Sequence, residues 1–221
     1  TDVTTVLWSL VVMSDDDDFF CHDAFRDDFR QVVGQFALRI EDVFAAMQGN
    51  ECIGEEQRAR SPRSPRSRLD NELDRSDMCM LHQFFLSCAV DQRFSQAVGA
   101  PGCDMHRVRQ LYEPRCKKAF LETLSAASDT QKRVRDVMVN HMHLNVDSEF
   151  RCERSGYSID MRATSCTSPA VWYVEVNGPS HYFAGQNRGK LGATRLKERH
   201  FELLGHQLVT VPYWDWDLMG Y

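Results

Sequence analysis

The sequence predicts an α+β protein in which an all-helical region precedes a C-terminal α/β domain. In the first part, apolar residues recur at steps of three and four, which is typical of amphipathic helices. After His143 they alternate with polar residues or form short continuous runs, which is typical of strands. We therefore expect repeat-like helices over residues 1–128, and the order helix, three strands, helix, strand over residues 129–221.

The helical part begins with a short apolar run, VLWSLVVM, which is far below the roughly 18 to 20 residues of a membrane-spanning helix. Further helices are expected over residues 78–92, 105–127 and 131–143. The longest apolar stripe ends at Gly49-Asn50 and comprises Phe25, Phe29, Val32, Val33, Phe36, Ile40, Val43, Phe44 and Met47.

Two charged segments interrupt these helices. The acidic run at residues 15–18 is interpreted as a solvated turn rather than a cation site. The Ser-Pro-Arg segment at residues 58–72 holds Pro62 and Pro65, which block a helix, so a flexible surface loop is expected there. Its arginines and Ser-Pro sites leave phosphate contact or kinase regulation open as alternatives.

Charge and cysteine content exclude some classes of protein. The net charge is −6, which argues against a protein that coats nucleic acid indiscriminately. Residues 1–128 hold 15 Lys/Arg and 21 Asp/Glu, whereas residues 129–221 hold 11 of each. The eight cysteines form no CxxC pair, so we expect reduced thiols and neither a structural metal nor a cofactor.

Strands are expected over residues 144–152, 157–163, 170–176 and 206–211. The third is nearly all apolar and is therefore predicted to be central in its sheet. The helix at residues 194–204 precedes Gly205, where a left-handed C-terminal stop is expected. An aromatic segment, YWDWDLMGY, closes the chain and is treated as following the last strand.

Two carboxylates fall where adjacent strands end together. Asp160 and Glu175 are expected side by side, with Glu149 near them on the preceding strand, and such acids can hold Mg²⁺ at a phosphodiester. A nuclease of that design also needs a lysine two positions after the second acid, where this chain has the neutral Asn177. Structural roles remain open: Asp160 pairing with Arg162, Glu175 accepting amides of the Gly178 turn, and Asn177 forming a turn.

The order of elements and the pattern D...ExN resemble the restriction-endonuclease-like, PD-(D/E)xK, fold with its lysine missing. More specifically, GYSIDM, VWYVEVNGPSHYF, LGATRLKERHFELLG and HQLVTVPYWDWDLM, at about residues 156–218, together resemble the RAP domain. This family was named for RNA-binding proteins abundant in apicomplexan parasites, and it also occurs in mitochondrial RNA regulators. Its members typically carry helical repeats before this domain and an Asp at the position of Asn177. The resemblance therefore implies a vestigial site at Asp160, Glu175 and Asn177, with no catalysis.

RNA contacts are expected on the basic helix and at the ends of the neighbouring strands. We expect Leu196, His200, Leu203 and Leu204 to form the buried side of the helix, which leaves Arg195, Arg199 and Glu202 on an outer flank. A plain solvated face is the alternative. Tyr213, Trp214 and Trp216 either stack on bases or pack in the core, and packing is favoured for at least two of them. The expected RNA-binding residues are His181, Arg188, Lys190, Arg195, Lys197, Arg199 and Trp214.

The resemblance implies a mitochondrial RNA-binding protein, which we expect to bind ribosomal RNA as a component or assembly factor of the mitochondrial ribosome, beside protein partners and away from membranes. No targeting segment is visible, and the chain does not begin with Met, which is typical of a processed or partial product. Two alternatives are a Mg²⁺-dependent nuclease using Asp160 and Glu175, and a scaffold that binds only proteins.

Overall fold

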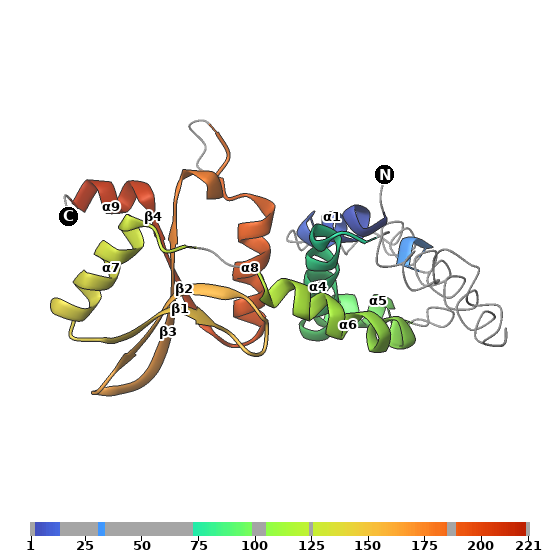
Figure 1. Ribbon diagram of the computed structural model, residues 1–221, viewed down its shortest axis with the longest axis horizontal. Helices are drawn as coiled ribbons and strands as arrows, with labels where there is room; N and C mark the ends of the chain where they lie inside the picture. The colour runs from blue at the N-terminus through green and yellow to red at the C-terminus, as the bar shows by residue number, and fades with distance from the viewer. Residues whose placement is uncertain are drawn as a thin grey trace, which may run out of the picture. The chain divides into compact units, whose positions relative to one another are not determined.

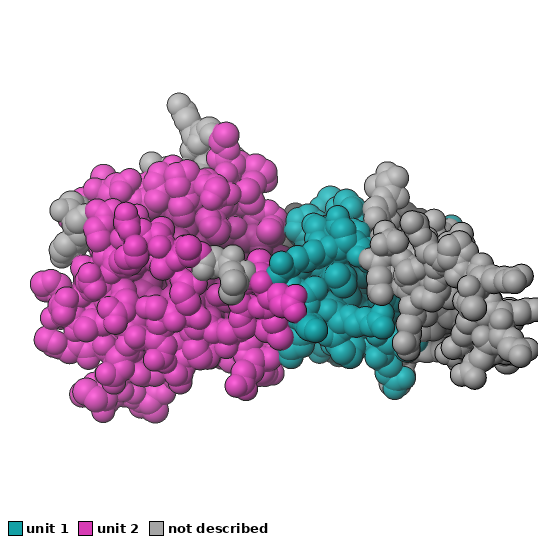
Figure 2. Space-filling model, in the orientation of Figure 1, with its two compact units in different colours: residues 1–120 teal, residues 121–221 magenta. Residues whose placement is uncertain are grey.

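The computed structural model describes residues 3–13, 31–33, 73–98, 105–123, 126–184 and 189–219. Two compact units are present, Thr1–Phe120 and Leu121–Tyr221 (Figure 2). The predicted helix over residues 25–47, the acidic run and the Ser-Pro-Arg loop lie outside the described residues, apart from a helical turn at residues 31–33. The predicted domain boundary after residue 128 stays a prediction.

The described part of the first unit is helical, with α1 (Val3–Met13), α4 (Arg75–Val90), α5 (Gln92–Val98) and α6 (Met105–Leu121). Helix α1 packs on α4, where the Trp8 indole N–H donates to Gln83 Oε1 at 2.6 Å. None of the described helices has the length and apolar content needed to cross a bilayer.

The helix predicted over residues 78–92 corresponds to α4. This helix ends at Val90, because the chain leaves the helical conformation at Asp91 (φ −102°, ψ 116°) before α5 begins. The buried Asp91 carboxylate accepts bonds from the Arg93 backbone N–H (3.0 Å) and from its guanidinium (2.8 and 3.1 Å). An Asp side chain that satisfies nearby donors competes with the helical backbone, which explains the break.

The second unit is mixed α and β, as the sequence predicts. Its elements follow the predicted order and add a final helix (Figure 1): α7 (Asp129–Asn140), β1 (Asn145–Arg151), β2 (Ser158–Ser165), β3 (Ser168–Asn177), α8 (Gly192–Leu203), β4 (Gln207–Pro212) and α9 (Tyr213–Met219). A 3₁₀ turn, Pro179–His181, follows β3. The aromatic segment that follows the last strand forms α9, which begins at Tyr213.

The four strands form one sheet in the order β1-β2-β3-β4. The pairs β1/β2 and β2/β3 are antiparallel, whereas β3/β4 is parallel because α8 returns the chain to the same end of the sheet. The register pairs Met161 with Val174, and Glu175 with Thr210. Strand β3 is therefore internal, as its apolar sequence predicts.

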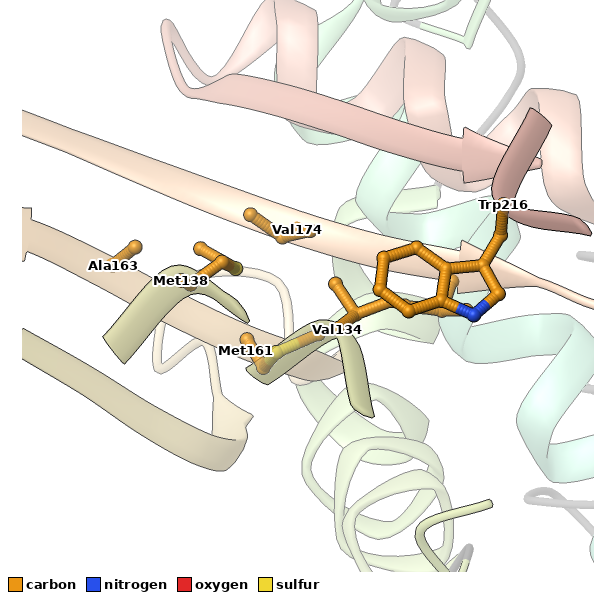
Figure 3. Packing of buried hydrophobic residues seen from close by; sticks show 7 residues of the cluster. Val134, Met138, Met161, Ala163, Val174 and Trp216 are labelled. Carbon is orange, nitrogen blue, oxygen red and sulfur yellow. The ribbon is translucent and has the colours of Figure 1, made fainter. Parts of the chain in front are cut away.

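Helices cover both faces of this sheet (Figure 1). On one face, α7 and α9 pack over the strands, and the Trp216 indole reaches from α9 toward Val134 of α7 (Figure 3). This buried core comprises Val134, Met138, Met161, Ala163, Val174, Val176 and Trp216. On the other face lies α8, whose buried Phe201 meets the Tyr173 ring edge-on at 5.4 Å.

Helix α8 ends as the sequence predicts, at a glycine in the left-handed conformation. Gly205 has φ 74°, its N–H donates to the Glu202 carbonyl, and the His206 N–H donates to the Phe201 carbonyl. This pair of bonds is the Schellman arrangement that closes a helix.

Replacing Trp216 tests whether α9 completes the core. Trp216 is 4% exposed, so Trp216→Ala removes a large buried ring and is expected to lower the free energy of unfolding by about 3 to 5 kcal/mol. Urea unfolding measures this. The matched change Leu218→Ala, at a side chain 81% exposed on the same helix, should stay within about 0.5 kcal/mol. Equal costs for the two variants would contradict the packing of α9.

Candidate functional site

Asp160 and Glu175 lie at the end of the β2/β3 ladder, where the carboxylate of each residue accepts a backbone N–H of the other strand. Asp160 Oδ2 accepts the Val176 N–H at 2.7 Å, and Glu175 Oε1 accepts the Asp160 N–H at 3.3 Å. The two residues lie opposite each other, directly beyond the Met161–Val174 pair. The predicted side-by-side arrangement is therefore confirmed, and both carboxylates take part in holding the strands.

Asp160 and Glu175 do not bind the neighbouring groups that were considered from the sequence. Arg162 bonds to Asp147 at 3.0 Å, and Glu175 accepts the Asp160 amide rather than amides of the Gly178 turn. Glu149, expected near the acids, is exposed and has a left-handed backbone (φ 51°).

Lys197 of α8 supplies a positive charge to the acid pair. Its Nζ lies 2.5 Å from Glu175 Oε1 and donates to the Ser158 carbonyl at 2.7 Å. The side chains are 20% exposed for Lys197 and 8% for Glu175, and the ammonium also lies over the Tyr157 ring, 5.8 Å from its centroid. One lysine therefore ties α8 to both β2 and β3.

The Glu175 carboxyl is hard to ionise despite this partner. Burial raises its pKa from the ordinary 4.5 to about 7, and the nearby Asp160 charge adds to the rise. Lys197 and the Asp160 N–H act in the opposite direction without cancelling the effect of burial.

Asn177 and His181 lie beyond the acids. Asn177, at the position where the nuclease pattern needs a lysine, is 1% exposed and uncharged. His181 Nδ1 lies 3.2 Å from Thr194 Oγ1, which joins the turn after β3 to the first turn of α8. Burial and then Lys197 lower the pKa of His181, against the opposite effect of Asp160 and Glu198, so the ring is neutral near pH 7.

Lys190 forms an ion pair with a second carboxylate, that of Glu198. Its Nζ donates to both oxygens of Glu198, at 2.7 and 2.9 Å, and Glu198 also accepts the Thr210 hydroxyl at 2.8 Å. This network joins the segment before α8 to β4, so the Lys190 ammonium has a protein partner already.

The cations of α8 are distributed differently from the sequence expectation. Arg199 is 8% exposed and belongs to the buried side, so its placement on an outer flank is wrong. Leu203, expected inside, is 43% exposed. Arg195 is exposed as predicted, and Arg188 lies outside the described residues.

Trp214 lies at the start of α9, in contact with the turn that follows β3. Its ring centroid is 4.4 Å from that of Tyr182 and 5.1 Å from that of Tyr213. Trp214 and Tyr213 are half-buried, and only Trp216 of the three is buried in the core.

Within the described residues, no group of three or more His, Cys, Asp and Glu side chains is placed to hold a metal ion. Of the eight cysteines, the five that the structure describes form no disulfide, and three of them, Cys88, Cys116 and Cys152, are buried.

The sequence expectations missed the role of Lys197, although a signal for it was present. Lys197 precedes the buried His200 and Phe201 by three and four residues, so it lies next to the buried stripe of α8. A lysine in that position must find an acceptor, and Glu175 is the buried carboxylate on the facing strand.

Comparisons with known proteins agree with the motif analysis. A family model described as RAP domain matches residues 174–221, which confirms the resemblance predicted from the sequence. The chain is also similar to FAST kinase domain-containing protein 3, mitochondrial, from Rattus norvegicus, with 21% identity over 160 residues. That similarity covers 68% of this chain and 24% of the relative, so the chain spans about a quarter of the relative's length.

The raised pKa of Glu175 predicts a specific pH dependence of stability. The folded protein binds this proton more tightly than the unfolded chain, so the stabilisation is complete below pH 4.5 and is lost as the pH rises through about 7. The free energy of unfolding of the wild type minus that of Glu175→Gln should therefore fall over this window, by at most about 1.4 kcal/mol per pH unit. Urea titrations at a series of pH values measure it, and a difference that rises with pH would contradict the burial effect.

Proposed function

We propose that this chain is a mitochondrial RNA-binding protein that acts without catalysis. The observation that carries the proposal is the RAP domain match at residues 174–221, because the resemblance connects this domain with RNA-binding proteins. The mitochondrial compartment is supported by the similarity to a relative whose name places it there.

The fold proposed for the second unit is restriction-endonuclease-like. Three features support it: the order α7-β1-β2-β3-α8-β4, the mixed sheet with its parallel β3/β4 pair, and two acids at neighbouring positions of β2 and β3. In this proposal the fold keeps a surface suited to phosphates while its acids serve the structure.

The RNA proposed is ribosomal, and the protein is proposed to be a component or assembly factor of the mitochondrial ribosome. The acidic composition of residues 1–128 supports docking on neighbouring proteins rather than on RNA, which assigns the nucleic acid to the second unit. This step rests on the resemblance.

The phosphate-contacting surface is proposed at the exposed first turn of α8. Arg195 is exposed there, the first turn holds no acidic residue, and Leu191 at the N-cap provides no side-chain hydrogen bond to the helix. Helix N-termini attract phosphate groups, and a guanidinium binds them through paired hydrogen bonds. Lys190 and Lys197 contribute less, since each is bound to a carboxylate.

A charge reversal tests this surface. Arg195→Glu is expected to weaken the binding of single-stranded RNA about tenfold at low salt and to reduce the slope of log K against log salt by about one. Fluorescence anisotropy with a labelled RNA over a salt series measures both. The matched control is Arg135→Glu, also exposed but on α7 at the opposite face of the sheet. Equal losses in the two variants would contradict a specific contact at α8.

A second candidate function, a Mg²⁺-dependent nuclease, is favoured by one observation. Lys197 reaches the acid pair from α8 and supplies the cation that Asn177 lacks. A lysine beside two acids would stabilise charge that develops on a phosphate during cleavage. The same ammonium, however, already contacts Glu175 and the Ser158 carbonyl, which favours the non-catalytic function.

Incubation of end-labelled RNA with Mg²⁺ or Mn²⁺ separates the two functions. The non-catalytic function predicts that the RNA stays intact at every protein concentration at which it is bound. The nuclease predicts cleavage that both Glu175→Gln and Lys197→Met abolish and that Asp147→Asn, an exposed acid elsewhere on the sheet, leaves unchanged.

A further inference from the structure

The carboxyl ends of the parallel pair β3 and β4 bring two separate segments together. Asn177 at the end of β3 lies opposite Pro212 at the end of β4, and α9 begins at the next residue, Tyr213. After β3, the 3₁₀ turn brings Tyr182 back to the same edge, where it contacts Tyr213 and Trp214. Crevices outside the carboxyl ends of parallel strands are common ligand sites in α/β proteins.

Three aromatic rings form this edge of the molecule. Tyr182 is 7% exposed and lies against Trp214 with 4.4 Å between ring centroids, and Tyr213 meets Trp214 edge-on at 5.1 Å. Trp214 and Tyr213 keep part of their surface in solvent, unlike Trp216 in the core. A partly exposed tryptophan supported from below by a buried tyrosine is a rigid stacking surface.

Two buried polar atoms at the same edge have no hydrogen-bond partner within the described part of the chain: Asn177 Nδ2 and Tyr182 Oη. Burial raises the pKa of the Tyr182 hydroxyl, and the neighbouring Asn177 side chain acts in the opposite direction. The two side chains therefore lie close together, although neither Asn177 Nδ2 nor Tyr182 Oη has a partner at the distance and angle of a hydrogen bond. Unsatisfied buried donors are costly and rare in native proteins, so two at one place point to a ligand that supplies acceptors.

We propose that Asn177, Tyr182 and Trp214 form a binding site for an unpaired nucleobase of single-stranded RNA. Trp214 offers the stacking face, while the Asn177 amide and the Tyr182 hydroxyl offer hydrogen bonds to the edge of the base. This inference rests on the proposed function and deepens it, because it assigns base contact to this edge and phosphate contact to Arg195.

Charges of both signs surround this site. Asp215 follows Trp214 directly and is exposed. Lys190 acts on the Tyr182 hydroxyl as a positive charge, and Glu198 and Asp215 act on it as negative charges. Because the Lys190 ammonium is bound to both oxygens of Glu198, the site suits a planar heterocycle, which carries no charge and presents both acceptors and a π-face.

The experiment compares two labelled oligomers of equal length and charge: a single-stranded RNA of mixed sequence, and the same sugar-phosphate chain without bases. Equal phosphate number makes the electrostatic part of binding the same for both. Wild-type protein is expected to bind the RNA about tenfold more tightly than the abasic chain, the scale of stacking one base on an aromatic side chain.

Two variants and a control locate this preference. Trp214→Leu is expected to abolish it while leaving the affinity for the abasic chain unchanged. Tyr182→Phe removes only an unsatisfied hydroxyl, so it should keep or raise the thermal stability but reduce the preference about threefold, the effect of one hydrogen bond. The control is Phe150→Leu, a half-buried ring on β1, which should leave the preference intact.

The possible outcomes separate this inference from the proposed function. Equal binding of both oligomers by the wild type, or a preference for the RNA that survives in both Trp214→Leu and Tyr182→Phe, overturns the base site while RNA binding stands. Binding of neither oligomer overturns the proposed function and the base site with it. A preference lost in Trp214→Leu, weakened in Tyr182→Phe and kept in Phe150→Leu supports both.

Discussion

The contact between Lys197 and Glu175 attaches helix α8 to the end of the β2/β3 ladder. Placing a carboxylate at 8% side-chain exposure is unfavourable unless it is paired and hydrogen-bonded, and here it accepts both the Lys197 ammonium and the Asp160 amide. The same ammonium bonds to the Ser158 carbonyl of β2, so a single side chain of α8 fixes the helix to two strands. Next to this attachment, the Asp160 N–H donates to the same Glu175 carboxylate, and His181 contacts Thr194 in the first turn of α8.

The cations on and near α8 fall into two groups, those held by contacts within the second unit and those that face solvent. Lys197 and Arg199 lie on the inner side of α8 and Lys190 binds Glu198, whereas Arg195 faces solvent. In a basic segment that looks uniform in sequence, Arg199 is therefore buried, two lysines are bound to carboxylates, and Arg195 is exposed. The neutral Asn177 and the rings of Tyr182 and Trp214 occupy the neighbouring edge, so phosphate attraction and base contact are proposed at separate places.

The sequence predicts the strands and helices of the second unit well, because a change from helical to strand periodicity is a local signal. The burial of Met161 follows from the alternation within YSIDMRA, and that of Val174 from the nearly all-apolar third strand. The break at Asp91 and the helix at Tyr213 depend on side-chain bonds and on packing against α7, which no local pattern contains. The Lys197–Glu175 pair joins residues 22 positions apart across a helix and a sheet, so only the assembled fold brings them together.

A double-mutant cycle on Lys197→Met and Glu175→Gln tests this attachment most directly, since it isolates the interaction of the two side chains from their separate effects on the free energy of unfolding. The exposed pair Arg162–Asp147 serves as the reference cycle, with an expected coupling of about 1 kcal/mol or less. Above pH 7, where the Glu175 carboxyl is ionised, a coupling of about 2 to 3 kcal/mol for Lys197 and Glu175 is the result that a buried structural ion pair predicts. A coupling no larger than that of the surface pair would contradict it.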